Sequence, residues 1–227
     1  YDHIFHDALL QKLPLIYCMD RAGVVGPDGP THHGVFDLSF MSMLPGMIVS
    51  APKDGNELRN LIATALYSGK NFSIRYPKDS SREYQENKSA DILKIGSWEM
   101  LHKGTETAIL CVGSMVGMIL DAKKTIYSEL GYLPSIINAR FIKPLDDKML
   151  IKICKDYNNI ITIEEGVLYG GFGSAVSSFL HDHQLDNKIH RIGIPDNFIE
   201  HGTRNELLHD IGLHADNVIS VLKNINK

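Results

Sequence analysis

The chain has 227 residues and a mass of 25.4 kDa, which is enough for one or two domains with a substantial core. Hydrophobic residues make up 44% and charged residues 22% of the sequence, which argues against disorder, collagen and coiled coils. The net charge of −4 argues against a nucleic-acid partner, which would call for a basic stripe. No apolar run approaches the roughly 20 residues of a membrane-spanning helix, so no membrane partner is expected.

The cysteines are few, and their number is odd. Cys18, Cys111 and Cys154 all lie within apolar runs of the sequence. Such a set predicts buried, reduced thiols in a reducing compartment, and we therefore expect a cytoplasmic protein.

Residues 1–77 predict a first α/β unit that is incomplete. Apolar residues recur at helical spacing over 1–11 with no cap before them, so this helix starts in its middle. We therefore expect the sequence to be a piece of a longer chain. Strands are expected at 13–19, 47–51 and 72–76, and a helix at 56–68.

Residues 78–92 are polar and aperiodic, and we interpret them as a linker. The remainder, 93–227, predicts a second unit that folds on its own. Its strands are expected at 107–112, 135–138, 160–164 and 189–194, and its helices at 116–130, 145–157, 173–183, 203–211 and 215–226. This alternation favours a mostly parallel sheet with helices on both faces.

The loop at 20–37 concentrates reactive side chains after a predicted buried strand. These side chains are Asp20, Arg21, Asp28, His32, His33 and Asp37. Ligands of α/β sheets bind outside the carboxyl ends of the strands, arginine suits anionic oxygens, and histidine exchanges protons near neutral pH. The loop is therefore typical of a site for an anionic, hydroxylated substrate. Composition alone favours a simpler alternative, a turn with solvated charges.

Other sites are poorly supported in this region. His32 and His33 are adjacent and cannot both face one metal from a regular element, which argues against zinc. The loop lacks the Gly-Lys-Ser/Thr of a P-loop, and Ser39 and Ser42 lack a nucleophile-elbow context. A glycine-rich segment at 166–174, GVLYGGFGS, could either cradle a phosphate or allow close packing of a helix on a strand.

The string DRAGVVGPDGPTHHGVFDLSF at 20–40 resembles the 1-deoxy-D-xylulose-5-phosphate synthase family, thiamine-diphosphate enzymes related to transketolase. The resemblance extends over the chain, through YDHIFHDALLQKL at 1–13, RYP at 75–77, FIKPLD at 141–146, EEG at 164–166, GGFGS at 170–174 and GIPD at 193–196 with Phe198. It implies an α/β fold. Part of a transketolase-type pyrimidine-binding domain, 1–77, would precede a transketolase C-terminal-like domain with a mostly parallel sheet.

The resemblance also implies an activity, the condensation of pyruvate with glyceraldehyde 3-phosphate with loss of CO2, which feeds isoprenoid and thiamine biosynthesis. Thiamine diphosphate and Mg²⁺ would be the cofactors, and a homodimer is expected. The resemblance assigns His32 and Asp28 as catalytic residues and Arg21 as substrate-binding. Lys78 stands where the family often has an arginine for the aldehyde's phosphate, so it keeps the charge but loses the bidentate fork.

The family's Gly-Asp-Gly motif for magnesium and diphosphate is not in the sequence. The glutamate and the aromatic residue that serve the cofactor's ring are not matched either. No residue is therefore assigned to the cofactor or to a metal, and the chain alone is expected to be inactive. Two alternatives stay open: another transketolase-like protein, such as a 2-oxo-acid dehydrogenase beta subunit or a split transketolase, and a non-catalytic module. Such a module would bind a nucleotide-like ligand at Gly170–Ser174 or only dimerise.

Overall fold

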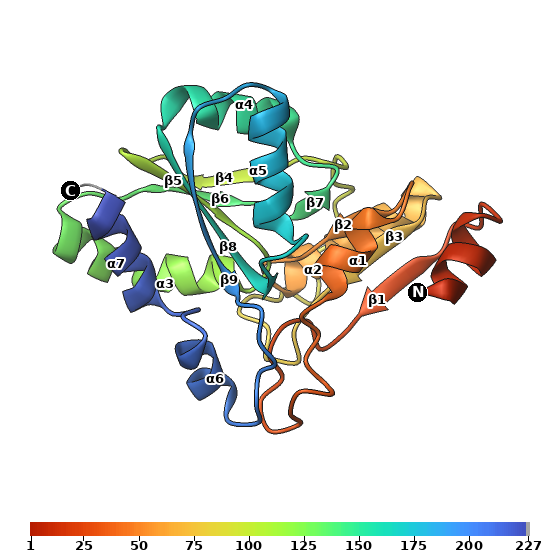
Figure 1. The fold of residues 1–227 in the computed structure, drawn as a ribbon. Helices are drawn as coiled ribbons and strands as arrows, with labels where there is room; N and C mark the ends of the chain where they lie inside the picture. The colour runs from red at the N-terminus through yellow and green to blue at the C-terminus, as the bar shows by residue number, and fades with distance from the viewer. Residues whose placement is uncertain (226–227) are drawn as a thin grey trace.

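The computed structural model describes residues 1–225, which form two neighbouring sheets with helices packed against them (Figure 1). The strand order is β1-β3-β2-β7 in the first sheet and β4-β6-β5-β8-β9 in the second. All strand pairs are parallel except β2 with β7 and β4 with β6. The predicted α/β fold with mostly parallel sheets is confirmed.

The first part of the chain supplies three parallel strands and their helices. Its elements are the π-helix η1 (Ile4–Leu9), β1 (Ile16–Met19), α1 (Asp37–Met43), β2 (Ile48–Ser50), α2 (Gly55–Ser68) and β3 (Phe72–Arg75). Strand β3 is buried along its whole length because it lies between β1 and β2. Helix α2 has strong local signals: Asp54 accepts a hydrogen bond from the Glu57 N–H at 2.8 Å, and Gly69 ends the helix at φ 58°.

The second part builds the larger sheet. Its strands are β4 (Glu99–His102), β5 (Thr107–Cys111), β6 (Ser135–Asn138), β7 (Phe141–Lys143), β8 (Asn159–Val167) and β9 (Lys188–Ile194). Its helices are α3 (Met115–Leu130), α4 (Asp147–Asp156), α5 (Phe172–Asp182), α6 (Arg204–Asp210) and α7 (Ala215–Ile225). The sequence predicted all of these helices, although the last predicted helix extends to Asn226, outside the described residues.

Strand β7 joins the two parts. It follows β6 in the chain but pairs antiparallel with β2, where Val49 faces Lys143 and Ser50 faces Phe141. Beside it, the Glu57 carboxylate of α2 accepts a hydrogen bond from Asn138 Nδ2 at 2.8 Å. The first sheet is therefore completed by a strand from the second part of the chain.

The prediction of three buried thiols is wrong for Cys18, which is exposed. Strand β1 lies at the edge of its sheet, so one of its faces meets solvent. Cys111 lies in the fully buried β5, and burial raises the pKa of its thiol. Cys154 is half-buried, and the same effect raises its pKa to about 11.

Residues 78–92 contain no helix or strand, and each of them is exposed. Short contacts nevertheless hold this segment against α2 and α3. The Gly55 N–H donates to Ser81 Oγ at 2.8 Å, and the guanidinium of Arg82 pairs with the carboxylate of Asp121. No helix within residues 1–225 is long and apolar enough to cross a membrane.

We predict that limited trypsin digestion of the native protein cuts first between Ser80 and Ser89, at Arg82 or Lys88, because this segment is exposed and belongs to no helix or strand. The C-terminal product should then resist further digestion. Since β7 stays paired with β2, the two products should co-elute from a sizing column until denaturant is added. Mass spectrometry identifies the first cut; an earlier cut within α3, at Lys123 or Lys124, would contradict the prediction.

Candidate functional site

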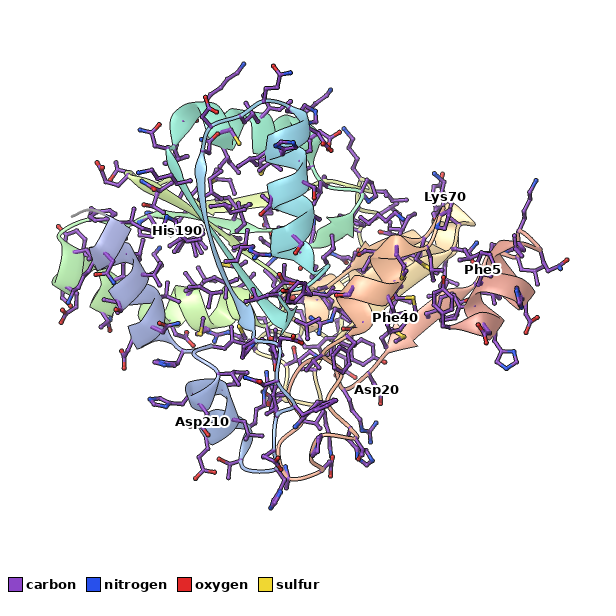
Figure 2. The ribbon with its side chains drawn as sticks, viewed as in Figure 1. Phe5, Asp20, Phe40, Lys70, His190 and Asp210 are labelled. Carbon is purple, nitrogen blue, oxygen red and sulfur yellow. The ribbon has the colours of Figure 1, made fainter. Side chains whose placement is uncertain are left out.

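The loop between β1 and α1 lies against the segment that leads into α6, where Gly29 approaches His201 and Gly26 approaches Gly202; Figure 2 labels Asp20 at the start of the loop and Asp210 at the end of that helix. Two hydrogen bonds close the loop on itself: the Gly23 N–H donates to the Gly34 oxygen at 2.7 Å, and the Gly34 N–H donates back at 2.9 Å. Arg21 has φ 58°, a left-handed conformation that is uncommon for a residue with a side chain. Such backbone strain is frequent at functional sites.

Of the four predicted site residues, Asp28 and Lys78 are in direct contact, whereas the guanidinium of Arg21 pairs with the neighbouring carboxylate of Asp20. Lys78 Nζ donates to Asp28 Oδ2 at 2.8 Å, although 50 positions separate the two residues. This hydrogen bond and the charge of Lys78 lower the pKa of the Asp28 carboxyl, and His32 and Arg21 act on it in the same direction. All four side chains are exposed, and the structure joins Lys78 directly to Asp28 on the loop that also carries Arg21 and His32.

The two adjacent histidines have different environments. The His32 ring is exposed, and its Nδ1 lies 3.0 Å from Thr31 Oγ1; no direct bond to Asp28 orients it. The His33 side chain is buried: its Nδ1 accepts the Val25 N–H at 3.1 Å, and its Nε2 lies 3.3 Å from the Glu200 carbonyl oxygen. An Nδ1 that accepts leaves the proton on Nε2, which can therefore donate to Glu200. His33 stabilises the loop, as expected for the histidine without a site role.

Sequence reasoning missed the buried charges beneath the loop. Arg75, only 5% exposed, donates from Nε to Asp37 Oδ2 at 2.7 Å and from Nη2 to the backbone carbonyl oxygen of Glu165 at 2.9 Å. Glu165, 2% exposed, accepts the Val24 N–H at 2.7 Å. The available signal was a pair of carboxylates, Glu164 and Glu165, placed directly after an apolar strand.

Two backbone N–H groups of the glycine-rich segment at 166–174 already donate to a carboxylate and are therefore not available to a phosphate. The Phe172 and Gly173 N–H groups, at the start of α5, each donate to the Glu164 carboxylate at 2.7 Å. Burial raises the pKa of Glu164 to about 7. A Cβ on Gly171 would lie 2.4 Å from Glu164 Oε2, so glycine is needed here for close packing.

A cavity of about 610 Å³ lies beside the segment that carries Lys78, but none of the four site residues lines it. The cations at its wall already have carboxylate partners: Lys53 with Glu99, Arg82 with Asp121 and Arg204 with Glu165. We place the candidate site at the exposed cluster around Asp28, because the sequence-predicted residues Asp28 and Lys78 are joined there.

This cluster can hold an anionic oxygen and exchange a proton with a bound carbonyl or hydroxyl group. It does not supply a magnesium–diphosphate anchor. Within residues 1–225, His, Cys, Asp and Glu side chains form no group of three that could hold a metal ion.

The sequence matches two families, described as "Transketolase, pyrimidine binding domain" over residues 1–83 and "Transketolase, C-terminal domain" over residues 96–218. It is 42% identical to the 1-deoxy-D-xylulose-5-phosphate synthase of Aquifex aeolicus, covering all of this chain and 36% of that protein. It is 43% identical to the Halalkalibacterium halodurans synthase, covering 99% of this chain and 36% of that protein. The chain thus spans little more than a third of the length of these relatives.

Two solved structures have a similar fold. A split gene transketolase, described as an inactive beta4 tetramer, superposes with a TM-score of 0.84 at 24% identity, covering 99% of this chain and 70% of that one. The transketolase of Campylobacter jejuni superposes with a TM-score of 0.67 at 17% identity, covering 92% of this chain and 31% of that one. At these identities the likeness concerns the fold alone.

We predict that replacing Lys78 with methionine raises the pKa of Asp28 toward the ordinary value of about 3.9, since the hydrogen bond and the nearest cation are lost. Carboxyl ¹³C NMR titration measures this pKa directly. A lowered pKa means that the ion pair stabilises the fold above the ordinary pKa and that this contribution disappears as the pH falls through the lowered value. Lys70→Met, at an exposed lysine away from the site (Figure 2), is the control and should leave the titration unchanged.

Proposed function

Because the chain belongs to the 1-deoxy-D-xylulose-5-phosphate synthase family, whose members are thiamine-diphosphate-dependent transferases, we propose that it is the C-terminal part of such a synthase. The reaction would condense pyruvate with glyceraldehyde 3-phosphate and release CO2. The contact of Lys78 with Asp28, on the loop that also carries Arg21 and His32, supports the proposal. The enzymes of this family use thiamine diphosphate and Mg²⁺. We propose that residues outside the described part of the protein bind these cofactors.

Each site residue receives a role that its chemistry supports. Lys78 would bind the phosphate of the aldehyde substrate, and Arg21 would hold a second anionic oxygen. Once Lys78 turns to the phosphate, Asp28 can accept hydrogen bonds from substrate hydroxyls. His32, exposed beside them, would exchange a proton with the carbonyl or hydroxyl group that reacts.

We also propose that the chain consists of a pyrimidine-binding part at 1–77, a linker at 78–92 and a C-terminal domain at 93–227. The two family matches support this division, since they leave only residues 84–95 between them. A cytoplasmic homodimer is also proposed. Exposed apolar side chains on and beside α1, Phe36 and Met43, are of the kind that dimerisation buries.

The two alternatives are less well supported. A split transketolase shares the fold, but the synthases match this sequence at 42–43% identity over nearly the whole chain. A module that binds a nucleotide-like ligand at Gly170–Ser174 would need free N–H groups at the start of α5. Glu164 already accepts two of them.

We predict that the 227-residue polypeptide alone forms no deoxyxylulose phosphate from pyruvate and glyceraldehyde 3-phosphate with thiamine diphosphate and Mg²⁺. Without an anchor for the diphosphate, the reacting carbon is not held near the substrate-binding residues. The complete product of the encoding gene should form it under the same conditions. Product from the polypeptide alone would contradict the prediction, and no product from the complete protein would overturn the proposed function.

We predict that in the complete protein His32→Ala lowers kcat by about 10²–10⁴-fold, the usual effect of removing a positioned proton donor. Its thermal midpoint should not change, because the ring is exposed. His33→Ala should do the reverse, lowering the midpoint while the folded enzyme keeps more of its kcat, because this ring is buried and bonds to Val25 and Glu200. Equal kcat for His32→Ala and wild type would rule out the assigned role.

A further inference from the structure

The most deeply buried contact of the site loop comes from the other part of the chain. Glu165, in β8, accepts the Val24 N–H with Oε1 at 2.7 Å and the Ser114 hydroxyl with Oε2 at 2.9 Å. Val24 lies between Arg21 and Asp28 in the loop. The carboxylate is therefore bonded to the backbone that carries the site residues, without touching the site itself.

Arg204, at the start of α6, completes this arrangement. Its Nη1 donates to Glu165 Oε1 and to the Val24 carbonyl oxygen, and its Nη2 donates to Glu165 Oε2 at 2.8 Å. Its Nε lies 3.5 Å from the carboxylate of Asp79, the residue next to Lys78. One guanidinium thus contacts both segments that carry the candidate site: the loop through Val24 and the end of β3 through Asp79.

Two glycines show how closely the loop approaches this pair. A Cβ on Gly23 would lie 2.2 Å from Glu165 Cδ, and Gly23 also has φ 77°. A Cβ on Gly26, at φ 82°, would lie 3.2 Å from the backbone nitrogen of Arg204. The loop therefore approaches the Glu165 side chain too closely for a side chain at Gly23, and it lies tightly against the backbone at the start of α6.

We propose that Glu165 and Arg204 are positioning residues that set the separation between the 21–34 loop and Lys78. Bonds to both the N–H and the carbonyl of Val24 fix the loop backbone, and the contact with Asp79 fixes the segment beside it. The effect of this separation on catalysis rests on the proposed function. The link itself, which is the set of contacts from Glu165 and Arg204 to Val24 and Asp79, does not depend on that function.

The link is tested on the chain itself by hydrogen exchange, with Glu165→Gln and the milder Arg204→Lys. Both variants keep the size of the side chain and lose either the charge or the planar fork. Amides of residues 22–34 should exchange about tenfold faster or more, because charged hydrogen bonds that hold the loop are lost. Amides of β5 should be unchanged. Arg82→Lys, which alters the exposed pair with Asp121, is the matched control and should leave the loop unchanged.

The positioning role is tested by kinetics of the complete protein. Arg204→Lys should raise KM for glyceraldehyde 3-phosphate by about tenfold or more, since misplacement of a binding group by about 1 Å has large effects. The rise should be smaller for unphosphorylated glyceraldehyde, which gains nothing from Lys78. The thermal midpoint should stay close to that of the Arg82→Lys control.

Unchanged exchange of residues 22–34 in both variants overturns the inference, whatever the activity. Faster exchange with unchanged KM in the complete protein also overturns it, because the link would then not position the site. A wild-type protein without synthase activity overturns only the proposed function, and the exchange experiment then decides about the link alone.

Discussion

A carboxylate that is removed from water must be paired, and Glu165 satisfies this requirement with partners from three parts of the chain. Transferring an ion to the interior costs several kcal/mol unless hydrogen bonds replace its hydration, and Glu165 is only 2% exposed. Its bonds to Val24, Ser114 and Arg204 therefore form together or not at all. This constraint acts on the path of the site loop, because the loop must bring the Val24 N–H to the carboxylate.

The same physical chemistry recurs along the junction of the two parts. Glu57, 4% exposed, bonds to Asn138 and pairs with Arg140, while Arg75, 5% exposed, donates to the Glu165 carbonyl oxygen. An apolar interface tolerates sliding, whereas buried charges allow few alternatives, because each displaced partner leaves an unpaired group. The junction is therefore specific in its geometry, which suits a site whose residues come from two separate segments.

Local signals explain what the sequence predicts well. Asp54 and Thr203 cap their helices through side chains, and the apolar runs of β5 and β8 form central strands. Non-local contacts explain what the sequence does not show. Strand β7 has only three residues and exists because β2 is available, and Cys18 is exposed because β1 lies at an edge. At the site, the reactive loop was evident, but Val24 and Glu165 are 141 positions apart and no local pattern relates them.

The contrast between the two ion pairs of the site follows from their burial. Asp28 and Lys78 are both exposed, and exposed pairs contribute little stability because water solvates each partner nearly as well. An anionic substrate could therefore replace Asp28 as the partner of Lys78 with little loss of stability. Glu165 is buried and Arg204 is largely covered, so separating them would leave the carboxylate without hydration. Binding can thus rearrange the exposed pair while the buried pair keeps the loop in place, so that exchange of partners at the surface need not disturb the backbone beneath it.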